Sequence, residues 1–244
     1  MASATQEFFS EQFASLDEAA RWPTSLPAKI GKRALDLMEN AKSIADQASA
    51  NPHLNEAGKA AARYDALLDS FVEIERAAAT LDRVEQETET AFRSLSTPSV
   101  DKSDLHSEMR DQEARSLVRA MPQEQRDHLE RLPPALAAAV IRAPAELSGV
   151  SPSVHAMVRT QMVEATHPDK VQTLRADKHA VELVRSALKD VKRKLDEAAQ
   201  FSPADRAEYM TRVKSKAALP KANSLYSADK IDAVRSTYAT LLKS

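Results

Sequence analysis

The longest regular pattern in this chain is AGKAAARYDALLDSFVEIERAAATLDRVEQETETAFRSL, residues 57–95. Mostly apolar residues recur in it at alternating intervals of three and four, which is the heptad spacing of a helix that packs along partner helices. The two series are Ala57, Tyr64, Phe71, Ala78, Glu85 and Phe92, and Ala60, Leu67, Ile74, Leu81, Thr88 and Leu95. At ~1.5 Å per residue the helix would be about 60 Å long. It therefore needs partners along its length.

Two shorter heptad patterns supply candidate partners. The one in residues 27–50 comprises Ile30, Ala34, Leu37, Ala41, Ile44 and Ala48. The other, in residues 171–200, comprises Leu174, Val181, Leu188 and Leu195 in one series and Asp177, Val184, Val191 and Ala198 in the other. No stretch alternates in the manner of a strand. The sequence predicts an all-α fold of long antiparallel helices, an elongated bundle or coiled-coil hairpin, with additional short helices.

Prolines divide the remainder of the chain. Pro122, Pro133, Pro134 and Pro144 predict short helices at about 104–121, 123–132 and 134–142, because proline interrupts a helix. Ser-Pro pairs at 151–152 and 202–203, Thr166 before Pro168, and Ser227 are expected to cap the helices that follow. Four regions result: an aromatic helix and connector in 1–26, a long hairpin in 27–100, short helices in 101–150 and a basic helical region in 151–244.

The composition argues against several classes of enzyme. The chain has three glycines and no cysteine, so phosphate loops, nucleophile elbows and thiolate sites find little or no support. Six histidines occur, but Glu164-x-x-His167 has no second copy, as a di-metal helical site would require. We therefore expect no catalytic residues, no cofactor and no metal. Without an apolar run of membrane-spanning length, we expect a location in the cytoplasm, or in a particle assembled there.

The net charge of −2 conceals an asymmetry. Residues 170–244 carry 16 basic and 9 acidic side chains, whereas the preceding residues carry 18 and 27. The favoured interpretation is that the two parts attract each other, within one chain or between subunits. The alternative is contact with nucleic acid phosphates. The candidate residues for that contact are Lys189, Lys192, Arg193, Lys194, Arg212, Lys214 and Lys216.

The N-terminal segment is a candidate partner-docking element. Its apolar residues fall at helical spacing and precede two X-Pro pairs that would hold the helix on a short connector. They are Phe8, Phe9, Phe13, Leu16 and Trp22. The alternative, that this helix covers the end of its own bundle, is equally open.

The tetrapeptide His167-Pro168-Asp169-Lys170 resembles the motif of J-domain co-chaperones. The resemblance implies stimulation of a heat-shock chaperone ATPase by a turn between two antiparallel helices. The chain departs from the family in the preceding helix, where Arg159 is the only basic residue of 153–166, and in the distance from Gly149 to His167. These departures favour a simple capped helix start.

As a whole, this alanine-rich, glycine-poor and cysteine-free chain resembles helical accessory proteins of tailed-phage virions. The stretch RAPAELSGVSP, residues 142–152, is in the style of turns found in such proteins. The resemblance implies a minor capsid, portal-associated, scaffolding or ejection component. We therefore expect a non-enzymatic structural or assembly protein that self-associates or joins a larger assembly, with a divergent co-chaperone and a nucleic-acid-associated protein as alternatives.

Overall fold

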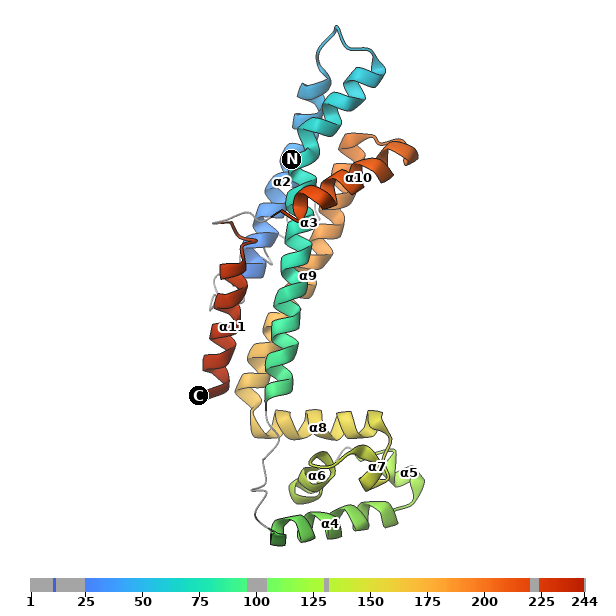
Figure 1. Ribbon diagram of the computed structural model, residues 1–244, viewed down its shortest axis with the longest axis vertical. Helices are drawn as coiled ribbons and strands as arrows, with labels where there is room; N and C mark the ends of the chain where they lie inside the picture. Colours follow the sequence, from blue (N-terminus) through green and yellow to red (C-terminus); the bar gives the residue numbers. More distant parts are fainter. Residues whose placement is uncertain (1–10, 12–24, 96–104, 130–131, 220–223, 244) are drawn as a thin grey trace. The chain divides into compact units, whose positions relative to one another are not determined.

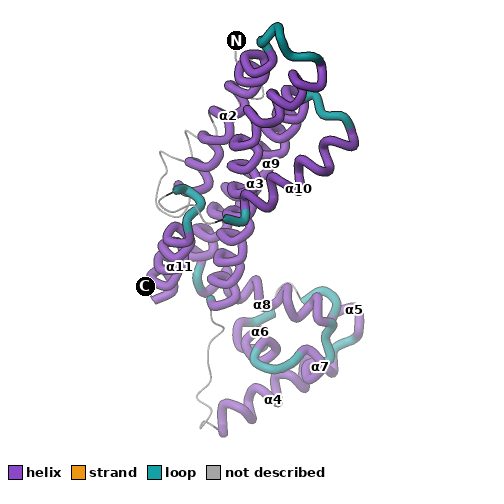
Figure 2. Tube along the Cα trace, turned by 45° about the horizontal axis from the view of Figure 1, so that its top comes forward, coloured by secondary structure: helices purple, strands orange, loops and turns teal. Residues whose placement is uncertain are grey.

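The computed structural model describes residues 11, 25–95, 105–129, 132–219 and 224–243. Within these residues every regular element is a helix, which confirms the all-α fold (Figures 1 and 2). The elements are α2 (Ser25–Ser49), α3 (Glu56–Ser94), α4 (Leu105–Ala120), α5 (Gln123–Arg126), α6 (Pro134–Ile141), α7 (Ala145–Ser148), α8 (Pro152–Thr166), α9 (Pro168–Ala199), α10 (Pro203–Ala217) and α11 (Ala228–Lys243).

The chain divides into two compact units. The first unit comprises Met1–Thr90 and Arg175–Ser244, and the second comprises Ala91–Leu174. This division differs from the four ranges expected along the sequence. The expected region 151–244 is divided between the two units at residue 174, inside α9. Helix α8 packs into the second unit through Val154 and Val158, whereas the part of α9 from Arg175 onward packs with α3 in the first unit.

Helix α3 is the shared partner of the other helices in the first unit. Figure 1 shows α2, α9 and α11 running beside it, with α10 crossing it. The companion heptad series lies inward: Leu67, Ile74 and Leu81 are buried. In the other series Phe71 is buried, but Tyr64, Ala78 and Glu85 are only half-buried. Leu68, Val72 and Val84 are buried too, because several helices, rather than one partner, surround α3.

Ion pairs tie the basic C-terminal part of the first unit to acidic residues of α3. Arg185 forms ion pairs with Asp82 and Glu85, and Lys192 forms one with Glu75. Because the later residue of α9 pairs with the earlier residue of α3, the two helices run antiparallel. Arg212–Asp65 and Lys216–Asp69 connect α10, and Arg235–Glu87 connects α11. At these contacts, basic residues of the C-terminal part are therefore paired with acidic residues of the same chain.

A cluster of four aromatic rings holds α10 on α3. The rings of Tyr64, Phe71, Phe201 and Tyr209 have centroids 4.6 to 5.8 Å apart, and Tyr209 donates a hydrogen bond to the Tyr64 carbonyl. The turn before α10 places Gln200 at a φ of 55°. Arg76 donates to the carbonyls of residues 216, 217 and 219 and so caps the C-terminal end of α10.

The second unit stacks α6 between α4 and α8. Its core is formed by small and branched side chains, including Val118, Val140 and Val158. The buried Asp111 of α4 accepts two hydrogen bonds of 3.0 Å from Arg142. At the end of α7, Gly149 adopts a left-handed φ of 64°, and Arg119 and Arg126 donate to the carbonyls of Leu147 and Gly149.

The expected caps are only partly correct. Ser151 and Ser202 accept hydrogen bonds from the backbone of Val154 and Asp205, as predicted. The prediction for Thr166 is wrong: it ends α8, and its hydroxyl donates to the Met162 carbonyl. The prediction for Ser227 also fails, because its backbone carbonyl, not its hydroxyl, accepts from Lys230 N–H. The expected helix 123–132 is shorter and ends at Arg126.

Candidate functional site

The sequence-predicted docking residues belong to the N-terminal segment, residues 1–26. Phe8, Phe9, Phe13, Leu16 and Trp22 lie outside the described residues, so the N-terminal interaction hypothesis stays a prediction.

The seven candidate nucleic-acid residues are mostly engaged with carboxylates of their own unit. Lys192, Arg212 and Lys216 pair with α3. Arg193 pairs with Asp190 and Glu197, and Lys194 shares Glu197. Lys189 and Lys214 are exposed and make no ion pair within the described residues. The structure therefore does not gather these seven residues into a single uncompensated basic surface.

The His167-Pro168-Asp169-Lys170 tetrapeptide lies at the start of α9. His167 is the single residue between α8 and α9; its N–H donates to the Val163 carbonyl, and its own carbonyl accepts from Val171 N–H. Asp169 sits in the first turn of α9, where the positive end of the helix dipole stabilises a carboxylate. The tetrapeptide thus joins two helices directly.

One face of α4 is apolar and exposed. Leu105, Met109 and Leu117 are 71%, 54% and 61% exposed. They are spaced four and eight residues apart and lie opposite the face that carries the buried Asp111, Arg115 and Val118. This α4 face (Leu105, Met109 and Leu117) was missed in the sequence. Its spacing is visible there, but nothing in the sequence indicates which side of α4 the other helices cover.

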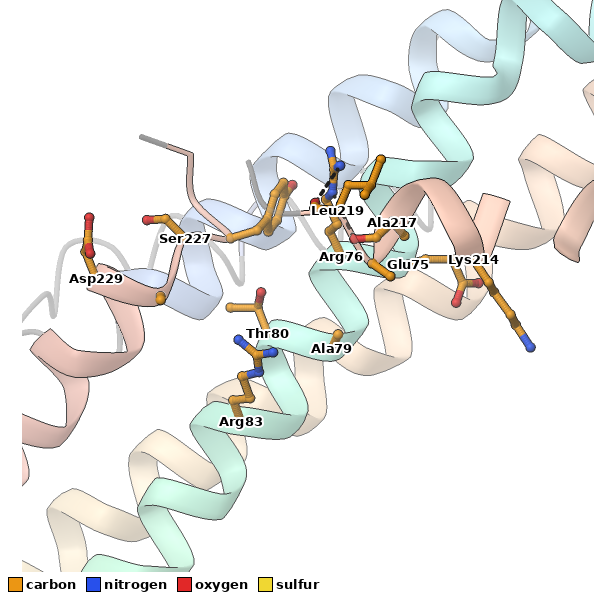
Figure 3. Close-up of a pocket in the computed structure, with 13 residues that line it drawn as sticks. Glu75, Arg76, Ala79, Thr80, Arg83, Lys214, Ala217, Leu219, Ser227 and Asp229 are labelled. Atoms are coloured by element: carbon orange, nitrogen blue, oxygen red, sulfur yellow. Dashed lines mark hydrogen bonds between the residues drawn. The ribbon is translucent and has the colours of Figure 1, made fainter. Parts of the chain in front are cut away.

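A pocket of about 620 Å³ opens in the first unit between α3, the end of α10 and the start of α11 (Figure 3). We call it the α3–α11 pocket. Thr80 and Arg83 of α3 and Ser227 before α11 line it, together with Arg76 and Glu75. Tyr226, also in its lining, donates to Glu73, and burial raises the pKa of this phenol. Ser227 was singled out from the sequence only as a helix cap, and the other groups named here were not singled out.

Two site classes find no support among the described residues. No group of three or more histidine, aspartate or glutamate side chains there is arranged to hold a metal ion. No described helix combines the length and apolarity needed to cross a bilayer.

Comparisons with protein-family models, with curated proteins and with solved structures find no match to this chain.

Proposed function

We propose that this chain is a non-enzymatic structural or assembly protein, a helical component of a larger particle, and that it associates with a second copy through the α4 face. The observation that supports this proposal is the exposure of Leu105, Met109 and Leu117 on one side of one helix. Large apolar side chains gathered on an exposed face characterise interaction surfaces, because covering them releases water.

The α4 face is self-complementary, which favours a second copy as the partner. If two α4 helices pack antiparallel about a two-fold axis, Leu105 of each lies opposite Leu117 of the other. Arg110 and Glu113 flank the centre of this arrangement, so each would meet the opposite charge across the interface. Both are exposed, and neither makes an ion pair within the described residues.

The type of particle rests on the resemblance to helical accessory proteins of tailed-phage virions. The role would then be that of a minor capsid, portal-associated, scaffolding or ejection component. The 39-residue α3, with α2, α9 and α11 packed along it (Figure 1), suits an extended structural component, since packing along its length supports it.

Light scattering over a concentration series tests the association. The full-length chain is expected to form a dimer or a larger symmetric oligomer. Met109→Gln with Leu117→Gln should weaken this association. The matched control is Leu219→Gln, because Leu219 is a comparably exposed leucine, 62%, in the first unit. A chain that stays monomeric at every concentration, or an oligomer that both changes weaken equally, would overturn the proposal.

Charge reversal tests the antiparallel geometry. Glu113→Arg places like charges opposite each other and should weaken association, whereas Arg110→Glu combined with Glu113→Arg should restore it. Failure of the double variant to recover would exclude this register. A chain lacking residues 1–24, which keeps α2 and its buried Leu26, tests the N-terminal docking hypothesis separately, since loss of association there alone would place the contact in that segment.

A further inference from the structure

The α3–α11 pocket is lined by two largely buried residues whose hydroxyl groups have no hydrogen-bond partner among the described residues. Thr80 is 4% exposed and Ser227 is 9% exposed. Neither hydroxyl makes a hydrogen bond within the described residues. Among the described residues the enclosed side-chain atoms without a partner are Arg126 Nε and Ser148 Oγ, so the hydroxyls of Thr80 and Ser227 reach the pocket surface and can donate to a polar molecule that enters it. Figure 3 shows Thr80 on the side of α3 that faces the start of α11.

An unpaired guanidinium lies next to Thr80. Arg83 is three residues further along α3, on the same helix face, and its side chain extends back toward Thr80 in Figure 3. This direction is the one that helical side chains favour, since they tilt toward the N-terminal end of the helix. Arg83 is exposed and makes no ion pair or hydrogen bond within the described residues.

The start of α11 adds backbone donors. Ser227 precedes this 16-residue helix, and the N–H groups of Ala228 and Asp229 have no backbone acceptor within the described residues. The N-terminal end of a helix carries partial positive charge and unpaired N–H groups, both of which stabilise an anion.

The remaining charged groups at the pocket are occupied or directed elsewhere. Glu75 is paired with Lys192 at 2.6 Å, and the Nε and Nη2 groups of Arg76 donate hydrogen bonds to carbonyls of α10. Figure 3 shows Asp229 and Lys214 directed away from Thr80 and Arg83. The groups left to meet a ligand are two hydroxyls, one guanidinium and backbone N–H donors.

We infer that the α3–α11 pocket binds the phosphate group of a small molecule. A phosphate offers several strong acceptor oxygens and a negative charge, which matches this set of donors. The volume of about 620 Å³ is that of a small-molecule site. A nucleic acid is a poorer match, because its affinity depends on several cations contacting successive phosphates, whereas Arg83 is the one unpaired cation of the lining that is directed toward Thr80. This inference does not depend on the proposed assembly, which uses the other unit.

Calorimetric titration of the full chain with inorganic phosphate, and with glycerol 3-phosphate as a phosphomonoester, tests the inference. Saturable binding is expected for the wild type. Arg83→Gln and Thr80→Val should each weaken it about tenfold or more, because each removes a donor to a charged acceptor. Thr80→Ser keeps the hydroxyl and should keep binding. If Thr80→Val fails to fold, Arg83→Gln and Thr80→Ser still decide the result.

The matched control is Lys189→Gln, which removes an exposed, unpaired charge of the same unit outside the pocket. It should change phosphate affinity less than twofold. No saturable binding of either probe would overturn the inference, as would equal losses for Lys189→Gln and Arg83→Gln. A third outcome would also overturn the inference: a single-stranded oligonucleotide binds more tightly than both probes, and Lys189→Gln and Arg83→Gln weaken that binding equally. This outcome would indicate a general cationic surface.

Discussion

The hydroxyl of Tyr238 donates a hydrogen bond of 3.1 Å to Asp177 Oδ2, and thereby connects α11 to α9. The same hydroxyl lies 2.8 Å from Thr88 Oγ1 of α3, and all three residues are buried. Thr88 and Asp177 are polar interruptions in two heptad series. Tyr238, from α11, contacts both residues, so the polar residue of the α3 series and that of the α9 series belong to one buried hydrogen-bond network.

Removing this hydroxyl should destabilise the first unit. Tyr238→Phe deprives Thr88 and Asp177 of a shared partner, and we expect a loss of about 1–3 kcal/mol in the free energy of unfolding. Urea unfolding of the full chain measures it. Tyr226→Phe is the matched control, since its hydroxyl donates to Glu73, which is only half-buried, whereas Thr88 and Asp177 are buried. Equal losses for the two variants would contradict a special role for the buried network.

Stability should fall at alkaline pH. Burial raises the pKa of the phenols of Tyr209, Tyr226 and Tyr238, so the folded chain holds these protons above about pH 10, where an unfolded chain releases them. The unfolded state then binds fewer protons than the folded state, and the free energy of unfolding decreases as pH rises. Below about pH 10 this contribution is fully present. In one pH titration, tyrosine ionisation, followed by tyrosinate absorbance, and unfolding, followed by circular dichroism, should occur together. Ionisation of all four tyrosines near pH 10 in a chain that stays folded would refute this prediction.

The left-handed turn at Gly149 should not tolerate a side chain. An added Cβ would lie 2.9 Å from Arg126 Nη1, and a φ of 64° disfavours residues other than glycine. Gly149→Ala should lower the stability of the second unit by about 1–2 kcal/mol from the backbone alone. Thermal unfolding measures the change, and an unaltered midpoint would show that Arg126 and the turn can rearrange freely.

The neighbouring residue provides a contrasting change. Ser148 is fully buried, and its hydroxyl has no hydrogen-bond partner within the described residues. Ser148→Ala should therefore be neutral, or stabilising by up to about 1 kcal/mol, because it removes an uncompensated polar group. A clear loss of stability in the same thermal assay would indicate that this hydroxyl does have a partner.

The pair between Arg142 and Asp111 should be costly to break from one side. Asp111 is 7% exposed, and Asp111→Asn leaves the arginine facing a neutral group. We expect a loss of about 3 kcal/mol. Asp111→Leu with Arg142→Met should cost less than the sum of the single changes, which a double-mutant cycle measures. Asp232→Asn, at the exposed pair with Arg235, is the control and should cost under about 1 kcal/mol. Additive losses at 111 and 142 would mean that the two residues do not act as a pair.

The sequence by itself predicted the long helices. The bounds Glu56–Ser94 of α3 nearly coincide with the heptad pattern of residues 57–95, because helix spacing and flanking prolines are local properties. The caps at Ser151 and Ser202 were predictable for the same reason. Ser227 was not, since its backbone carbonyl rather than its hydroxyl accepts from Lys230 N–H, and the residue type does not distinguish these two geometries.

Only the tertiary structure decided which faces are covered and which groups meet. Leu105 and Leu81 are both leucines of amphipathic helices, yet Leu81 is fully buried and Leu105 is exposed, because other helices surround α3 while α4 is packed on one side. The opposition of Thr80 and Arg83 to the start of α11 joins residues about 150 positions apart. A heptad pattern marks the apolar face of one helix, but which faces are covered and which distant residues meet depends on the packing of the whole chain.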